Sequence, residues 1–246
     1  VRVDLGMTTP SDSECDNQYT RAAAQLTAWK KDGILARDPQ PSLTFVEESF
    51  NGPDGRANVR HGFLAAMRLY EFDQGVVFPH EQTLSGPKED RYRLMTATAM
   101  NLSPMFLLYD LPGDEITAAW AARLSPQPPT ASVTMEDGTV TKLWATSDPG
   151  LLETVKRSLE TSRFVIADGH HRYETALRYQ KAQGQDPREG TRACDYALAY
   201  FSNMADPGLA IYGTHRLVTG LDSSAAFSLV KLKRLVQQQD VTLLLT

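Results

Sequence analysis

Residues 164–176 read FVIADGHHRYETA, and this stretch decides which fold class the rest of the chain must fit. Residues 163–167 form a short, mostly apolar run that predicts a compact buried strand. Gly169 permits a sharp turn in which a Cβ atom would interfere. Helix-forming residues continue over 173–182 and stop at Gly184. The order strand, turn, helix indicates a protein that combines a sheet with packed helices.

Strands and helices alternate on both sides of this stretch. Dense turn signals at residues 51–55 and at Asp137-Gly138 each predict a hairpin, and hairpins exclude a purely parallel sheet. We therefore predict a mixed α/β fold of the α+β class, with a mixed sheet, hairpins and flanking helices. The predicted helices are one capped by Asp16 and stopped by Gly33, then 88–101, 115–124, 149–162 and 223–239. The other predicted strands are 43–46, 63–72, 105–109, 131–135, 140–146, 196–201 and 209–212.

A proline-rich connector divides the chain near its middle. Residues 125–129 read SPQPP, a stiff composition. It predicts an N-terminal part, residues 1–125, and a second part, residues 130–246, that contains the Asp-Gly-His-His-Arg turn. The chain begins with Val1 and ends in an apolar run at 241–246, so we expect it to be a fragment of a longer protein.

Composition excludes several classes of function. The chain has 246 residues, of which 41% are hydrophobic, so it can bury a sizeable core. Its 25 Lys and Arg residues against 30 Asp and Glu residues give a net charge of −5, which argues against a general nucleic-acid binder. The basic run at 231–234 is interpreted as a solvated helix face.

The cysteine content and the lengths of the apolar runs indicate the cellular compartment in which the protein is expected. Cys15 and Cys194 are too few for a disulfide framework; one bridge between them is possible, but a reduced cytoplasmic chain is simpler. No charged-then-apolar signal pattern opens the sequence, and no run of about 18 apolar residues occurs. We expect a cytoplasmic protein with no membrane span.

The turn after the predicted strand carries the most chemistry. A helix that starts here offers free N–H groups and a partial positive charge, and Arg172 adds a planar fork suited to phosphate. His170 and His171 point about 100° apart on a helix, which indicates different roles. Their spacing is not that of H-E-x-x-H, so a zinc site is disfavoured and no protein metal site is predicted. Asp168 is either a helix cap or a catalytic carboxylate.

Three further segments contain candidate catalytic or ligand-binding residues. The loop at 79–83 places His80 beside Glu81, a candidate general base or metal ligand whose alternative is an ordinary solvated loop. Lys88 and Arg91 open the next predicted helix, where they either contact phosphate or form ordinary surface charges. The last segment follows the strand predicted at 209–212 and repeats the His–Arg pair, with His215 and Arg216.

Residues 166–176 resemble the signature of the bacterial and archaeal DUF1015 family, a family of unknown function. The resemblance extends to the loop at 79–83, the step at 88–91, Thr214-His215-Arg216 and the opening helix with Gly33-Ile34-Leu35, and it spans most of residues 17–218. Members of the family usually carry a further N-terminal segment with a proline-rich motif and a longer C-terminal region. We expect any site residues in those regions to lie outside this sequence.

The five residues from Asp168 to Arg172 are also similar to the nucleotide-binding motif of ParB-like and sulfiredoxin-like domains, most of all to the free serine kinases among them. This resemblance implies a ParB/sulfiredoxin-like subregion around the turn. It further implies that the motif binds the phosphates of a nucleotide, while a separate carboxylate deprotonates a serine hydroxyl.

Together these observations predict a phosphotransferase that acts on a small hydroxylated metabolite such as serine. The expected catalytic residues are Glu81, Asp168 and His170. The expected phosphate and ligand contacts are His80, Lys88, Arg91, Gly169, His171, Arg172, His215 and Arg216. Mg²⁺ would accompany a nucleotide or pyrophosphate and bridge its oxygens to a carboxylate. Two alternatives stay open: a phosphatase acting on phosphoserine-like compounds, and a non-catalytic protein that binds a nucleotide for regulation.

Overall fold

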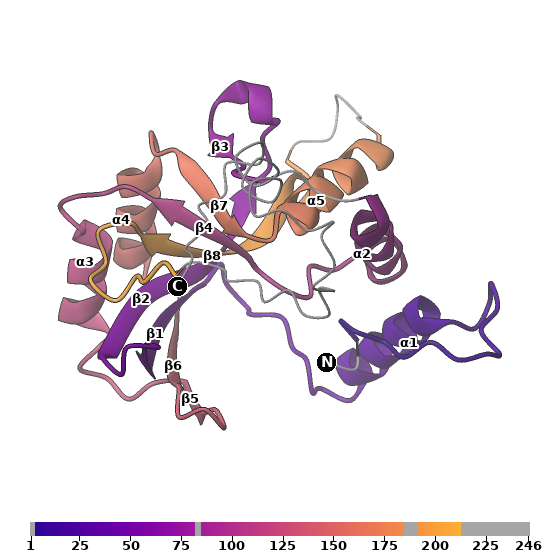
Figure 1. Cartoon of the computed structure of the whole chain (residues 1–246), viewed down its shortest axis with the longest axis horizontal. Helices are drawn as coiled ribbons and strands as arrows, with labels where there is room; N and C mark the ends of the chain where they lie inside the picture. The colour runs from indigo at the N-terminus through magenta and orange to yellow at the C-terminus, as the bar shows by residue number, and fades with distance from the viewer. Residues whose placement is uncertain (1–2, 82–84, 185–190, 213–246) are drawn as a thin grey trace, which may run out of the picture. The chain divides into compact units, whose positions relative to one another are not determined.

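One mixed sheet of eight strands organises the chain (Figure 1). The computed structural model describes residues 3–81, 85–184 and 191–212. The strands lie in the order β3-β7-β4-β8-β2-β1-β6-β5, with β3 pairing β7 and β4 pairing β8 in parallel and all other pairs antiparallel. Their bounds are β1 Leu43–Asn51, β2 Ala57–Arg68, β3 Val77–Phe78, β4 Met105–Tyr109, β5 Ala131–Thr134, β6 Val140–Thr146, β7 Phe164–Asp168 and β8 Tyr196–Asn203. The mixed α+β class is therefore confirmed.

The described residues form five α-helices, which fall into two groups. Figure 1 shows α3 beside α4, whereas α2 lies beside α5 with α1 further out along the same side. Trp120 of α3 contacts the rings of His61 in β2 and Trp144 in β6, which fixes α3 against the antiparallel half of the sheet. The helices are α1 Gln18–Lys31, α2 Ser85–Thr98, α3 Glu115–Arg123, α4 Pro149–Leu159 and α5 His170–Ala182, and two short 3-10 helices cover η1 Phe72–Gln74 and η2 Ala193–Asp195.

Aromatic rings from neighbouring strands form the centre of the core. Phe63 of β2 stacks on Phe201 of β8 with ring centroids 5.0 Å apart, and Phe164 of β7 meets Phe201 edge to face at 5.6 Å. The strands approach closely at Gly62, where a Cβ atom would come within 2.4 Å of the Phe201 carbonyl oxygen. Glycine at this position therefore lets β2 and β8 pair while the rings stack.

Both predicted hairpins are present, although one strand is displaced. The second strand was predicted at 63–72, but β2 starts at Ala57 because pairing resumes directly after the turn, with Asn51 opposite Ala57. The Asp137-Gly138 turn joins β5 to β6, and Gly138 has a positive φ of 85°. Turn chemistry thus locates hairpins well, whereas alternation of apolar residues misplaces their strand ends.

Several helix ends and one strand differ from the predictions. Asn17, not Asp16, caps α1, because its side chain accepts from the Tyr19 and Thr20 N–H groups. The helix predicted from residue 88 begins at Ser85, and α5 begins at His170 rather than residue 173. Residues 209–212 form no strand, since Asp206 turns the chain after β8 and accepts from the Gly208 N–H. The helix predicted at 223–239 lies outside the described residues.

The chain separates into two compact units, Val1–Ala210 and Ile211–Thr246, and the sheet belongs to the first. Strands β1 and β6, from either side of the proline-rich connector, pair within that sheet. The predicted division into residues 1–125 and 130–246 stays a prediction, which separate expression of the two parts would test. Cys15 and Cys194 are both free thiols. Among the described residues, no helix combines the length and the apolar character needed to span a bilayer.

Candidate functional site

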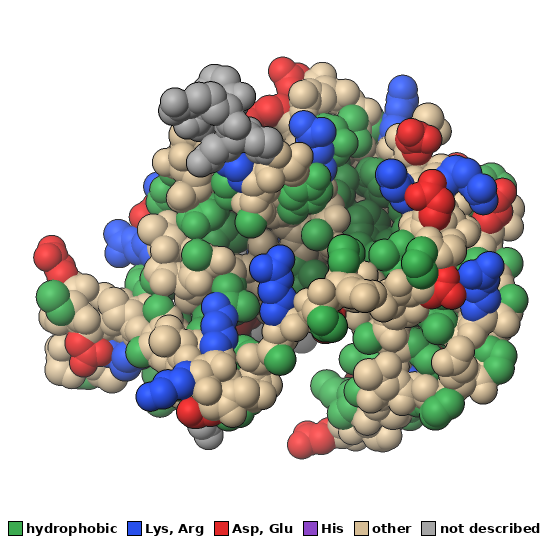
Figure 2. Space-filling model, turned by 180° about the vertical axis from the view of Figure 1, so that it is seen from behind, with side chains coloured by type: hydrophobic (Ala, Val, Ile, Leu, Met, Phe, Trp, Pro, Cys, Tyr) green, Lys and Arg blue, Asp and Glu red, His purple; other side chains and the backbone are tan. Residues whose placement is uncertain are grey.

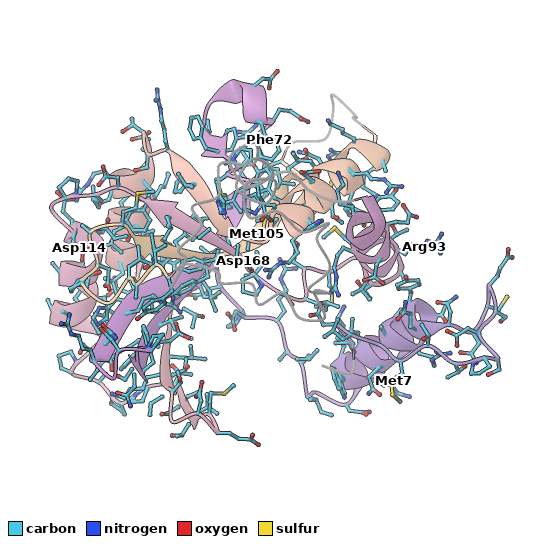
Figure 3. All side chains as sticks on the ribbon, viewed as in Figure 1. Met7, Phe72, Arg93, Met105, Asp114 and Asp168 are labelled. Atoms are coloured by element: carbon cyan, nitrogen blue, oxygen red, sulfur yellow. The ribbon has the colours of Figure 1, made fainter. Side chains whose placement is uncertain are left out.

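The turn between β7 and α5 is shaped by a glycine in the left-handed region. Gly169 is the N-cap of α5 with φ 93° and ψ 29°, and its carbonyl accepts from the Tyr173 N–H at 2.9 Å. Gly169 has no side chain with which to cap the helix. The helix dipole favours an anion at this end of α5. Figure 3 shows Asp168 near Met105, where β7 runs antiparallel to β4.

Arg172 folds back over this glycine. Its guanidinium group donates hydrogen bonds to the Asp168 carboxylate and to the Pro104 carbonyl. A Cβ atom at residue 169 would lie 2.9 Å from Nε of Arg172, closer than such contacts normally come. Glycine is thus favoured here by the positive φ, and any larger residue would also make the guanidinium shift.

His170 forms a pair with Glu81 beside the same helix end. Its Nε2 atom accepts from the His80 backbone N–H at 3.2 Å, so the ring proton sits on Nδ1, which lies 3.1 Å from Oε1 of Glu81. His170 is 2% exposed, and this burial lowers its pKa more than the Glu81 charge raises it. His170 is therefore a neutral donor that orients the Glu81 carboxylate at neutral pH.

His80 supports this pair from the end of the loop. Its Nδ1 atom lies 2.6 Å from the Ile166 carbonyl oxygen, so Nδ1 carries the proton and donates. The ring meets His170 edge to face, with centroids 4.4 Å apart. His80 thus ties the loop before α2 to strand β7 and to the buried histidine.

A cleft of about 370 Å³ brings most of the predicted residues together. Two further residues line it that the sequence did not suggest, Asp4 and Ser103. Arg91 Nη1 donates to the Asp4 carbonyl at 3.0 Å and to its carboxylate at 2.8 Å, and the Ser103 hydroxyl donates to the same carboxylate at 2.9 Å. No local motif marks Asp4, because its partners are distant in sequence. The predicted residues that line the cleft are Glu81, Arg91, Asp168, Gly169, His170, His171 and Arg172.

The remaining predicted residues lie elsewhere. Lys88 is not among the lining residues; its Nζ atom pairs with Glu174 at 2.8 Å. His80 does not line the cleft, although its backbone N–H donates to His170, which does. His215 and Arg216 lie outside the described residues.

Charge in the cleft is nearly balanced. Two guanidinium groups, Arg91 and Arg172, face three carboxylates, Asp4, Glu81 and Asp168, and each arginine is already paired with an aspartate. On the face shown in Figure 2, Lys and Arg side chains are likewise scattered among acidic and apolar ones. Such a distribution suits a small ligand held by specific contacts better than a long polyanion held by a basic surface.

Among the described residues, one set of side chains could hold a metal ion. His80, Glu81 and His170 each offer one ligand atom, and these atoms lie within 4.8 Å of one another. Such a set suits transition metals, but His170 would first have to lose the Nδ1 proton that it donates to Glu81. Mg²⁺ prefers oxygen ligands, and within this set only Glu81 supplies one.

Comparison with known proteins identifies a family for the chain but gives no information about its activity. Residues 1–241 match the family described as "Protein of unknown function (DUF1015)". No curated protein and no solved structure gives a match.

Proposed function

The chain belongs to the DUF1015 family, and we propose that it binds a small phosphorylated ligand and transfers a phosphoryl group to a small hydroxylated metabolite such as serine. One observation carries the proposal: a single cleft joins the N-terminus of α5, two arginines and a carboxylate oriented by a buried neutral histidine. Phosphoryl transfer needs mainly positioning and charge stabilisation, and these are the groups that supply them.

The phosphate would lie at the Gly169–Arg172 turn. There the N-terminus of α5 and the guanidinium of Arg172 would meet it, and Arg91 lines the same cleft. Because carboxylates outnumber guanidinium groups in the cleft, a phosphate chain would bring Mg²⁺ with it. The ion would then share the phosphate oxygens with one or two of the carboxylates.

Glu81 is the proposed general base. Its side chain is 52% exposed to the cleft, and the His170 Nδ1–H fixes one of its oxygens, which leaves the other for the acceptor hydroxyl. Asp168 suits this role less well, because the Arg172 guanidinium already occupies it. Asp168 would then position Arg172 rather than remove a proton.

Two alternative functions make different predictions from the same cleft. If Glu81 activates water, the protein is a phosphatase and releases serine from phosphoserine without an acceptor nucleotide. If the protein only binds a nucleotide for regulation, there is no turnover, and changing Glu81 leaves the affinity intact.

The test uses the purified chain with Mg²⁺, serine and, in turn, ADP, ATP or pyrophosphate. Phosphorus NMR follows the appearance of phosphoserine, and a parallel sample starts from phosphoserine alone. We expect Glu81→Gln, which keeps an oxygen that accepts from His170, to lower the rate by about 10²- to 10⁴-fold and leave ligand affinity within about 3-fold. Glu153→Gln, on the exposed face of α4, is the matched control. Absence of phosphate-ligand binding and of turnover in either direction would refute the proposal.

A further inference from the structure

A second cavity lies further along the same face of α5. Arg172, Thr175, Ala176, Tyr179 and Gln183 recur at intervals of three and four residues, so they form one stripe along the helix. The first of them lines the cleft described above, whereas the last three line a separate cavity of about 380 Å³ near the C-terminal end of the helix. The stripe from residue 172 to residue 183 is about 16 Å long.

A smaller cavity of about 30 Å³ lies between the two. Its lining residues Arg91, Ser103 and Arg172 also line the cleft. Its lining residues Met95, Met100 and Asn101 also line the second cavity. The three cavities therefore adjoin one another, and we call this row of cavities the groove.

The two ends of this groove differ in chemistry. The cleft holds arginines and carboxylates, but no charged side chain is among the described residues that line the second cavity. Instead, Tyr179 and Tyr196 offer ring faces, and Met95 and Met100 offer thioether chains. The side-chain amides that line this cavity, Asn101 and Gln183, supply both donors and acceptors.

Such a lining fits a flat, neutral heterocycle. Aromatic and methionine side chains contact its faces, while amides can pair with ring nitrogens and exocyclic groups at its edge. A ligand that also reaches the cleft must be extended, with a charged group at one end and a neutral ring at the other. A nucleoside di- or triphosphate has this form.

We propose that the second cavity is the nucleobase pocket of the phosphate donor, with the phosphates at the start of α5 and the sugar between the two. This inference rests on the proposed function and deepens it: it makes the donor a nucleotide rather than pyrophosphate. Pyrophosphate would occupy only the cleft, so the second cavity would have no role in binding it.

The first test compares two ligands on three proteins. Calorimetry with Mg²⁺ measures the affinity for ADP and for pyrophosphate of the unmodified chain, Tyr179→Ala and Tyr179→Phe. Loss of a ring that stacks on a base is expected to weaken ADP binding by about 5- to 100-fold, while pyrophosphate affinity stays within about 2-fold. Tyr179→Phe keeps the ring and should bind ADP nearly as the unmodified chain does.

The second test needs no substitution. Cys194 lines the second cavity, whereas Cys15 is exposed elsewhere and serves as an internal control. ADP with Mg²⁺ should slow alkylation of Cys194 by iodoacetamide and leave Cys15 unaffected, as read by mass spectrometry of the two peptides. Pyrophosphate should protect neither thiol.

The outcomes separate the two proposals. If neither ADP nor pyrophosphate binds, the proposed function itself is contradicted. If pyrophosphate binds but ADP binds no more tightly and does not protect Cys194, the nucleobase pocket is refuted while the phosphate site stands. Equal loss of affinity for both ligands in Tyr179→Ala, with no protection of Cys194 in the unmodified chain, would also overturn the pocket.

Discussion

Gly169→Ala is the substitution that most sharply probes the geometry of the turn. An alanine there must adopt φ 93°, and its Cβ would meet Nε of Arg172 at 2.9 Å and Cζ at 3.1 Å. The backbone strain alone costs about 1–2 kcal/mol. In a chain of 246 residues this lowers the melting temperature by about 2–8 °C.

The contact with Arg172 adds a second effect. The guanidinium must shift from its place between Asp168 and the Pro104 carbonyl. A hydrogen bond to a charged group contributes about 1.5–3 kcal/mol, so losing the contact between Arg172 and a bound phosphate weakens affinity by at least about 10-fold. Stability and affinity should therefore both fall in Gly169→Ala.

Gly138→Ala is the matched control. Gly138 has φ 85° in the β5–β6 turn, and nothing lies within 4 Å of a Cβ built there. We expect a similar loss in melting temperature, followed by circular dichroism, and an unchanged affinity for pyrophosphate with Mg²⁺ in calorimetry. If Gly169→Ala binds pyrophosphate as tightly as Gly138→Ala does, the role given to the Gly169–Arg172 contact is wrong.

Three further predictions concern single residues. Lys88 pairs with Glu174 outside the cleft, so Lys88→Ala should leave ligand affinity unchanged in calorimetry. It should cost at most about 1 kcal/mol of unfolding free energy. A large loss of affinity would contradict the boundaries of the site. Asp206 raises the pKa of His61, so the extra stability of the unmodified chain over His61→Gln in urea unfolding should be full below pH 6.5 and shrink as the pH rises above it. Burial lowers the pKa of His170, so the stability of the unmodified chain relative to His170→Gln should instead fall as the pH drops below 6.5. If the stability difference between the unmodified chain and either histidine variant does not change with pH, the direction of that histidine's pKa shift is wrong.

Local signals in the sequence predicted what depends on neighbouring residues. The Asp137-Gly138 turn and the turn at 51–55 gave the hairpins, and the strand-turn-helix order around Gly169 gave the start of the candidate site. Asp168 and Arg172 are four residues apart, so their pairing also follows from local helical geometry. These features need no knowledge of the rest of the chain.

What the sequence could not predict depends on contacts between distant segments. Asp4 reaches Arg91 across 87 positions, and His80 reaches His170 across 90, so no local pattern indicates either contact. The proton position on His170 follows only from the His80 N–H that meets it. Lys88 looked like a phosphate contact beside Arg91, but the packing of α2 on α5 directs it to Glu174.

Local sequence patterns also cannot predict the order of the strands in the sheet. Apolar alternation cannot reveal that β3 and β5 form the two edges or that β4 lies between β7 and β8. Those pairings bring the end of β7 beside the start of β4 and so create one wall of the cleft. The resemblance to the DUF1015 family was visible in the sequence and is confirmed over residues 1–241. The ParB-like reading of the turn stays a prediction.

A crystal structure of the chain with ADP and Mg²⁺ tests the central claim most directly. We predict phosphate density at the Gly169–Arg172 turn, against the N-terminus of α5, with the Glu81 carboxylate near the terminal phosphate. Phosphate density at any other place on the molecule would contradict the account.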